Sequence, residues 1–261
     1  MNNKEKIKEY WNQQATTFQE SAQATIPDLL LKELELENIS KYLTDNTKVI
    51  DIGCGNGYST FYYATNKNIK IDGVDYSERM IEIAKKTLNK KQIGHENRIS
   101  FYVADVLNLN MTQKEYDVAI TDRCLINLTS YEDQLQAVKE IHKILKPGGL
   151  YLMCEDSKSG LSNLNVLRKE VDLYEIEERW HNLYIDEKIF EQIDNLFDVI
   201  EVNNFSSFYY LASRIINGKI ADLKNVAPKY DSDINQIARK ISSMGDFGNF
   251  GPLKLFILKK K

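Results

Sequence analysis

Glycines and carboxylates at one point of this 261-residue chain are the residues whose types and spacing could do chemistry. The stretch VIDIGCGNG places Gly53, Gly55 and Gly57 directly after an apolar run. Glycines at a strand end let the backbone turn tightly and let a ligand come within contact distance. The spacing differs from the G-x-G-x-x-G turn that holds a pyrophosphate. Because the neighbouring carboxylate of Asp51 suits a cation better than a pyrophosphate, the turn predicts a ligand with an ammonium or sulfonium group.

Two further carboxylates end the next two apolar runs. Asp75 closes KIDGVD, and Asp105 lies in ISFYVADV. Asp75 can accept both hydroxyls of a ribose in a bidentate hydrogen bond. Asp105 can accept from an exocyclic amine, such as N6 of adenine. Acidic residues at the ends of three successive strands therefore predict a nucleoside ligand beside the glycine turn.

The elements that must position these carboxylates alternate along the chain. Repeated strand–helix–strand units imply parallel strands, right-handed crossovers and helices on both faces. The sequence thus predicts an α/β fold with a doubly wound sheet, whose ligand lies beyond the carboxyl ends of the strands. Ser77 is the expected N-cap of one helix. The predicted strands are 48–53, 70–75, 99–106, 116–122, 150–156, 197–205 and 253–260, and the predicted helices are 58–66, 77–90, 131–149 and 186–196.

Two segments do not follow this alternation. Residues 1–47 are predicted to be helical, and residues 206–252 form a long insertion between the last two strands. Long insertions at one edge of a compact sheet are usually functional covers. We therefore predict an N-terminal helical cover, 1–47, and a Rossmann-like core, 48–261, in which 157–186 and 206–252 form a substrate cap.

Composition excludes several classes of protein. The net charge is −4 and the pI is about 5.6, which argues against a nucleic-acid partner and makes Lys259–Lys261 a solvated tail. No apolar run approaches the roughly 20 residues of a membrane span, so we expect a cytoplasmic protein with no membrane partner. Cys54, Cys124 and Cys154 lack C-x-x-C spacing, which predicts buried free thiols and no metal site.

The stretches VIDIGCGNG, GVDYSERMIEIAKK, YVADVLNL, YDVAIT and ILKPGGLYLM resemble, in this order and spacing, the class I S-adenosylmethionine-dependent methyltransferases. The resemblance runs from Val49 to about Met153. It implies a seven-stranded sheet of order 3-2-1-4-5-7-6, with LKLFILKK as the antiparallel seventh strand. It also implies S-adenosyl-L-methionine as the cofactor, with Asp51 facing its methionine ammonium group.

The same resemblance implies further contacts with the cofactor. Tyr76 and Met80 would flank the adenine, and Val106 would help Asp105 to recognise its edge. Aromatic residues of YWNQQATTFQ, among them Trp11 and Phe18, could close over the cofactor; both could equally be packing anchors. The complete implied set is Tyr10, Trp11, Asp51, Gly53, Gly55, Gly57, Asp75, Tyr76, Met80, Ala104, Asp105, Val106 and Asp122.

Methyl transfer from a sulfonium is an in-line displacement, so the protein mainly has to hold the reacting atoms in line. The stretch TDRCLINLTS should point Asp122, Arg123 and Asn127 into the site. Arg123 could anchor an anion through its planar fork, or form a salt bridge with Asp122 or Asp156. The stretch is not of the N-P-P-Y type that holds a flipped base, which argues against DNA methylation.

Candidates for proton transfer follow the fifth strand. Asp156 lies at its end beside Glu155, and His181 in WHNLYIDE is the best candidate for a general base. The alternative for His181 is packing beside Trp180. The predicted catalytic residues are His181, Arg123 and Asp156. The predicted substrate-binding residues are Arg123, Asn127, His181, Asn182, Tyr184, Tyr209, Tyr210 and Arg214.

These features predict an enzyme that methylates oxygen or nitrogen of a small polar metabolite. The stretches DRCLINL, WHNLY, SSFYY and PLKLF resemble a subgroup of small bacterial methyltransferases. Arg123 and Arg214 fit a sugar, nucleotide-linked or phosphate-bearing acceptor, such as a precursor of a bacterial surface polysaccharide. The alternatives are a protein or RNA methyltransferase and a non-catalytic cofactor-binding module. We expect a monomer or a homodimer.

Overall fold

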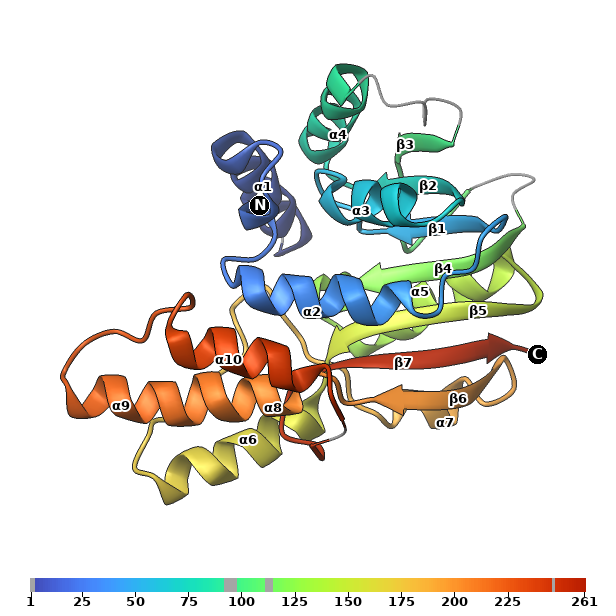
Figure 1. The fold of residues 1–261 in the computed structure, drawn as a ribbon. Coiled ribbons are helices and arrows are strands. Elements are labelled where there is room, and N and C mark those ends of the chain that lie inside the picture. The colour runs from blue at the N-terminus through green and yellow to red at the C-terminus, as the bar shows by residue number, and fades with distance from the viewer. Residues whose placement is uncertain (1–2, 92–97, 111–114, 246) are drawn as a thin grey trace.

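The computed structural model describes residues 3–91, 98–110, 115–245 and 247–261. Its centre is a seven-stranded sheet of order β3-β2-β1-β4-β5-β7-β6 (Figure 1). β7 pairs antiparallel with β5 and β6, and the other pairs are parallel. The predicted doubly wound sheet and its strand order are therefore confirmed. The strands are β1 (Lys48–Ile52), β2 (Lys70–Asp75), β3 (Ile99–Val103), β4 (Tyr116–Asp122), β5 (Leu145–Asp156), β6 (Phe197–Asn203) and β7 (Leu253–Lys260).

Helices cover both faces of this sheet (Figure 1). One apolar cluster joins the sheet to α2, α3, α4 and α10, and a second joins its opposite face to α5 and α7. Alternation along β1 sends Val49 into the first cluster and Ile50 into the second, as the period of two in a strand requires. The helical segments are α1 (Asn3–Phe18), η1 (Ala22–Ala24), α2 (Leu29–Ser40), α3 (Tyr58–Asn66), α4 (Glu78–Lys91), η2 (Leu125–Asn127), α5 (Tyr131–Ile144), α6 (Lys158–Glu170), α7 (Ile189–Gln192), α8 (Ser207–Tyr210), η3 (Leu211–Ile216), α9 (Asn217–Leu223) and α10 (Asp233–Ser242).

Several predicted boundaries are wrong, and local chemistry explains one of them. The helix predicted over 131–149 ends at Ile144, because Pro147 forces the preceding residue out of the helical region. The helix predicted over 186–196 shrinks to the single turn of α7. The strand predicted over 99–106 ends at Val103. Ser77 does cap α4, where its hydroxyl accepts from the amide of Met80 at 3.1 Å.

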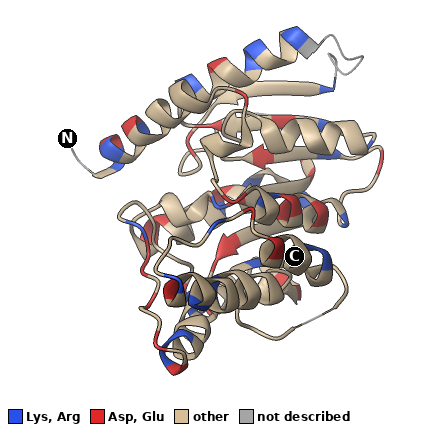
Figure 2. Ribbon diagram, turned by 60° about the vertical axis from the view of Figure 1, so that its left-hand side comes forward, with Lys and Arg blue, Asp and Glu red and all other residues tan. Residues whose placement is uncertain are grey.

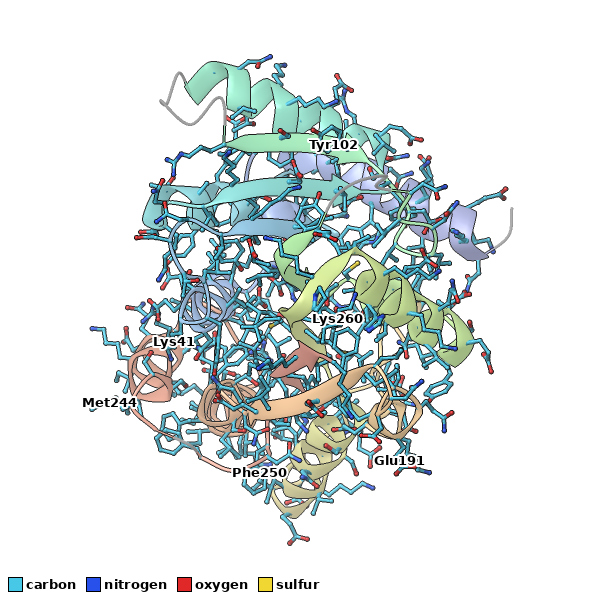
Figure 3. The ribbon with its side chains drawn as sticks, turned by 90° about the vertical axis from the view of Figure 1, so that its right-hand side faces the viewer. Lys41, Tyr102, Glu191, Met244, Phe250 and Lys260 are labelled. Carbon is cyan, nitrogen blue, oxygen red and sulfur yellow. The ribbon has the colours of Figure 1, made fainter. Side chains whose placement is uncertain are left out.

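Lys259 and Lys260 belong to β7, which corrects the predicted tail, whereas Lys261 follows the strand; Lys259 and Lys261 are exposed, as predicted. Figure 3 shows Lys260 on β7, well away from Tyr102 on the edge strand β3. The ammonium group of Lys260 donates to the carbonyl oxygens of His142 and Leu145, at 2.7 Å each. Lys260 therefore ties the end of α5 to the sheet.

The segments predicted as a cap are largely helical and lie together beyond one end of the sheet (Figure 1). α6 packs against η3, and α10 packs against both α8 and α2. η3 is a π-helix, a rare form that is frequent at functional sites. Lys, Arg, Asp and Glu are interspersed over these helices and the core (Figure 2). None of the helices in the described ranges has the length and apolar character needed to cross a membrane.

Candidate active site

The glycine turn after β1 is shaped by backbone conformation and by close packing. Gly53, Gly55 and Gly57 have φ angles of 74°, 54° and 81°, in the region that strains other residues. A Cβ atom on Gly53 would lie 2.6 Å from Sγ of Cys124. One on Gly57 would lie 2.7 Å from the ring of Phe101. Gly57 is therefore a packing residue here, whereas Gly53 and Gly55 line a cavity.

Two cavities adjoin the glycine turn at the carboxyl ends of the strands, as the fold predicts. The larger has a volume of about 180 Å³ and the smaller about 70 Å³. They share lining residues, so they meet at one place. The shared residues are Gly53, Asp75, Tyr76, Cys124 and Asn127.

Asp75 stands at this meeting point, and its carboxylate is held by backbone amides. Oδ2 accepts from Gly55 at 2.9 Å, and Oδ1 accepts from Ser77 at 2.8 Å. Each oxygen keeps a second lone pair, so the carboxylate can still accept from a ligand. Burial raises the pKa of Asp75 to about 6, although the two amides act in the opposite direction.

Asp51 lies behind the turn, on the α3 face of β1. Its Oδ2 accepts from the hydroxyl of Thr60 at 2.5 Å, and the residue is 2% exposed. Burial raises its pKa to about 6. Asp51 does not line either of the two cavities. Its predicted contact with a ligand ammonium group therefore stays a prediction.

The smaller cavity has apolar walls and one acidic edge. Ile52, Val106 and Leu107 line it, together with Ala104 and Asp105. A planar apolar group with a hydrogen-bond donor on its rim fits this lining. These walls hold the predicted adenine contacts Ala104, Asp105 and Val106.

The carboxylate of Asp105 forms an ion pair with a lysine of α1. Nζ of Lys4 lies 2.7 Å from Oδ2 of Asp105, and both side chains are partly exposed.

The hydroxyl of Tyr76, at the junction of the cavities, is buried without a hydrogen-bond partner among the described residues. Met80 is buried and lines the larger cavity.

Charged side chains at the end of β4 form a buried network with α2. Nζ of Lys32 lies 2.5 Å from Asp122 and 3.0 Å from Glu35. Nε of Arg123 lies 3.1 Å from Glu35. Burial alone would raise the pKa of Asp122, but Lys32 and Arg123 hold it below its usual value. Arg123 therefore forms a salt bridge with Asp122, at 3.8 Å, as one alternative had it, and a closer one with Glu35, which the sequence did not predict.

The backbone that carries Arg123 is held from β5 by Glu155. Arg123 has φ of 52°, a conformation uncommon for a residue with a side chain. The carboxylate of Glu155 accepts from the amides of Cys124, Leu125 and Ile126, at 3.0 to 3.3 Å. Glu155 is therefore a structural anchor of this turn and does not reach the cavity.

Asp156, the next residue, lines the larger cavity. It is 6% exposed, and its Oδ1 has no hydrogen-bond partner among the residues that the structure describes. Burial raises its pKa to about 6, although Arg123 acts to lower it. A buried carboxylate oxygen with a free acceptor position is suited to receive a proton or a hydrogen bond.

His181 lies in an aromatic cluster at the same cavity. Its ring stacks on Tyr10, with centroids 4.7 Å apart, and meets Trp11 and Trp180 edge-on. It is 3% exposed, and Nδ1 lacks a partner within the described chain. Burial and nearby Arg179 lower its pKa to about 4. His181 thus both packs beside Trp180 and lines the cavity, as a neutral imidazole at neutral pH.

The remaining predicted substrate residues divide into two groups. Asn127, Asn182, Tyr184, Tyr210 and Arg214 line the larger cavity. Tyr209 is fully buried, and its hydroxyl donates to Oδ1 of Asp28 at 2.6 Å, so it supports the cavity from outside.

Arg214 is held by an ion pair and by aromatic rings. Its Nη2 lies 2.7 Å from Oδ2 of Asp28. Its guanidinium also faces the rings of Tyr210 and Tyr230, at 5.2 and 5.0 Å. These contacts keep the π-helix η3 against the start of α2.

Sequence patterns missed several residues of the larger cavity and its supports. Asp28 caps α2, and Lys32 and Glu35 lie on this helix, whose sequence resembles that of an ordinary helix with charged residues. Arg179 and Tyr230 come from segments predicted only as cap. The stretch PDLLLKELELE does contain one signal: Lys32 and Glu35 stand three positions apart among leucines, the spacing of a charge pair on one helix face. In the structure this pair is buried on α2.

Comparisons with known proteins define the class. A family model described as a methyltransferase domain matches residues 43–193, more than half of the chain. The 27-O-demethylrifamycin SV methyltransferase of Amycolatopsis mediterranei (strain S699) is 27% identical over 140 residues, which cover 54% of this chain. The aligned region spans 47% of that relative's length.

Solved structures show the same fold. The CcbJ methyltransferase of Streptomyces caelestis superposes with a TM-score of 0.63 at 13% identity, over 96% of this chain and 97% of that one. The N-methyltransferase NodS of Bradyrhizobium japonicum WM9, solved with S-adenosyl-l-homocysteine, gives 0.58 at 13% identity, over 100% and 99%.

The strand order and the rim of carboxylates define a Rossmann-like protein of the class I methyltransferase type. The chain belongs to the methyltransferase domain family whose model it matches. The resemblance of residues 49–153 to this class is therefore confirmed.

Proposed function

We propose that this protein transfers a methyl group from S-adenosyl-L-methionine to an oxygen or nitrogen atom of a small polar acceptor. The observation that carries the proposal is the pair of joined cavities. The smaller is apolar with one acidic edge, the larger is lined by charged and aromatic side chains, and Asp75 stands where they meet. This arrangement suits a nucleoside on one side of Asp75 and a polar acceptor on the other.

The residues present fit the methyl donor. Ile52 and Val106 give apolar walls for an adenine, and Asp105 provides an acceptor at its edge. The free lone pairs of Asp75 suit ribose hydroxyls. A Cβ at Gly55 would lie 3.0 Å from Thr25, so the turn leaves no room for a side chain on the cavity side. When bound, the donor supplies a methyl group that its sulfonium already activates.

The chain's own residues then orient the acceptor and exclude water. Asp122 and Arg123 are fixed by Lys32 and Glu35, which limits their movement while the reacting atoms align. Asp156 and His181 each present a buried atom without a partner in the described chain, Oδ1 and Nδ1. Both groups are mainly unprotonated at neutral pH, so either can accept the proton of a hydroxyl or an amine.

A small acceptor is favoured over a protein or RNA. The larger cavity draws its lining from α1, α2, the strand ends and the cap, and His181 within it is almost completely buried. The relative from Amycolatopsis mediterranei is named for a small molecule, 27-O-demethylrifamycin SV. A sugar, nucleotide-linked or phosphate-bearing acceptor, including a surface-polysaccharide precursor, stays a prediction from the sequence.

The proposal can be tested in two stages. Calorimetric titration with S-adenosylmethionine and S-adenosylhomocysteine should show that both bind; failure of both would refute the proposed donor. A bacterial extract is divided by dialysis into small molecules and macromolecules, and each fraction is incubated with methyl-labelled donor. We expect a labelled small molecule that chromatography separates from the donor, and label in macromolecules that protease or ribonuclease releases would support the alternative instead.

The same assay tests the proposed base. His181→Ala should slow labelling, and an unchanged rate across the pH range would show that His181 accepts no proton. Asp156→Asn is the parallel variant, because it keeps the shape of the side chain and removes its basicity. Binding without label in any fraction would support a non-catalytic module.

A further inference from the structure

Three arginines line the larger cavity, and two of them have carboxylate partners. Arg123 lies 3.1 Å from Glu35, and Arg214 lies 2.7 Å from Asp28. For Arg179, the structure has no carboxylate within 4.0 Å among the residues it describes. Arg179 is exposed, so its guanidinium is available to a ligand.

The two paired arginines are unsuited to bind an anion, contrary to the expectation from the sequence. Glu35 is completely buried and Asp28 nearly so. If either arginine turned to a ligand, it would leave a buried carboxylate without that partner, which is costly. Arg214 would also lose its contacts with Tyr210 and Tyr230.

Asp156 lines the same cavity as Arg179 and is close enough to be affected by its charge. The positive charge of Arg179 acts on the carboxyl group of Asp156 and on His181. Oδ1 of Asp156 is buried and lacks a hydrogen-bond partner in the described chain. Buried polar atoms are rarely left so in native proteins, and an unpaired one points to a group that the cavity is built to receive.

We propose that Arg179 and Asp156 together select the methyl acceptor. Arg179 binds an anionic group of the acceptor, a carboxylate or a phosphate, and Asp156 accepts from the hydroxyl or amine that is methylated. This inference rests on the proposed function and names the class of acceptor: a small anion that also carries a nucleophilic hydroxyl or amine.

The proton balance of the reaction assigns Asp156 its role. The nucleophile forms its new bond to the methyl carbon, and its own proton passes to Oδ1 of Asp156. The carbon–sulfur bond of the donor breaks with its electron pair left on sulfur, so the positive charge of the sulfonium disappears. Asp156 then returns the proton to water.

The first test uses the fluorescence of the two tryptophans of the chain, because one lines this cavity and the other packs against a residue that lines it. Trp11 lines it, and Trp180 packs against His181. The protein is saturated with S-adenosylhomocysteine and titrated with inorganic phosphate, with chloride at equal ionic strength as the reference. We expect a saturable change in fluorescence. Arg179→Ala should weaken the phosphate affinity about tenfold or more, as loss of a charged hydrogen bond does.

Arg79→Ala is the matched control, because Arg79 is a partly exposed arginine of α4 that pairs with Glu82 at 2.5 Å outside the cavity. It should respond to phosphate as the wild type does. Equal affinity of all three proteins for S-adenosylhomocysteine shows that the variants are folded. A wild-type protein without a saturable response to phosphate, or an Arg179→Ala variant that keeps it, would overturn the proposal.

The second test uses the labelled extract. Electrophoresis of the product made by the wild type should show that it becomes more negative between pH 2 and pH 7, because its carboxylate or phosphate ionises in this range. Arg179→Ala should form this product at least about tenfold more slowly at low extract concentration. A product whose charge does not change in this way would refute this inference alone. Failure to bind the donor, or binding without any product, would instead refute the proposed function on which it rests.

Discussion

The smaller and the larger cavity meet at Gly53 and Asp75, yet they are built in different ways. The smaller takes its walls mainly from the ends of β1 to β4, and backbone amides hold Asp75 at its entrance. The larger joins α1, α2, the strand ends and the cap, and ion pairs between side chains hold its charges. The donor side therefore depends on backbone conformation, and the acceptor side depends on long-range pairing of charges.

The largest expected effect is on the acceptor side. At pH 8, above the pKa of Glu35, which burial raises to about 7, Glu35→Gln should lower the free energy of unfolding by about 3–5 kcal/mol, because it leaves the buried cations of Lys32 and Arg123 with Asp122 as their main counter-charge. Denaturation in urea measures this change. Glu33→Gln is the matched control on the same helix: its exposed pair with Arg239, at 2.9 Å, should contribute less than about 1 kcal/mol. Equal effects of the two variants would contradict the contrast between the cavities.

A slightly smaller effect is expected at the glycine turn. Gly53→Ala should cost about 2–4 kcal/mol of stability, because its φ of 74° disfavours a side chain and the new Cβ would meet Cys124. Gly245→Ala is the control, since a Cβ there meets nothing within 4 Å. Urea denaturation compares the two. If Gly53→Ala were as stable as the control, the turn would not be constrained as described.

The pH dependence of donor binding tests the carboxylate at the junction. The folded pKa of Asp75 is about 6, above its ordinary value of 3.8, so the folded state binds more protons between these values and its stability falls as pH rises through that range. Donor binding favours the ionised form. Affinity for S-adenosylmethionine should therefore fall about tenfold from pH 7 to pH 5, as protonation of one group predicts.

Calorimetric titrations at several pH values measure this slope. Asp75→Asn should bind the donor more weakly at pH 7 and with a shallower pH dependence, because the titrating carboxylate is gone. A variant with a slope as steep as the wild type would show that Asp75 is not the titrating group.

The smallest expected effect lies at the rim of the smaller cavity. Lys4→Ala removes the pair with Asp105 and should change stability by less than about 1 kcal/mol. It should also raise the donor affinity slightly at low salt, because Asp105 becomes free to accept from adenine, and the gain should vanish at high salt. Lys146→Ala is the control, since its partly exposed pair with Asp117, at 2.6 Å, lies outside both cavities. Identical titrations for the two variants would mean that Lys4 does not compete for Asp105.

The predicted site residues that the structure brings together at the cavities include three at strand ends. Gly53, Asp75 and Asp105 end or closely follow strands, so the alternation of strands and helices is enough to bring them to one edge of the sheet. Two predicted residues that line neither cavity are placed by the neighbours that they contact. Gly57 packs on Phe101, and Tyr209 turns to Asp28, for reasons that no local pattern contains.

The sequence by itself determined the doubly wound sheet, the glycine turn and the line of carboxylates, because these follow from periodicity and from backbone conformations that act over a few residues. Only the tertiary structure decided which charges are paired and which are available. Arg214 and Asp28 are 186 positions apart, and Lys32 and Asp122 are 90 apart. Their pairing depends on how α2 and the cap pack on the strand ends, and that packing leaves Arg179 and Asp156 open to a ligand.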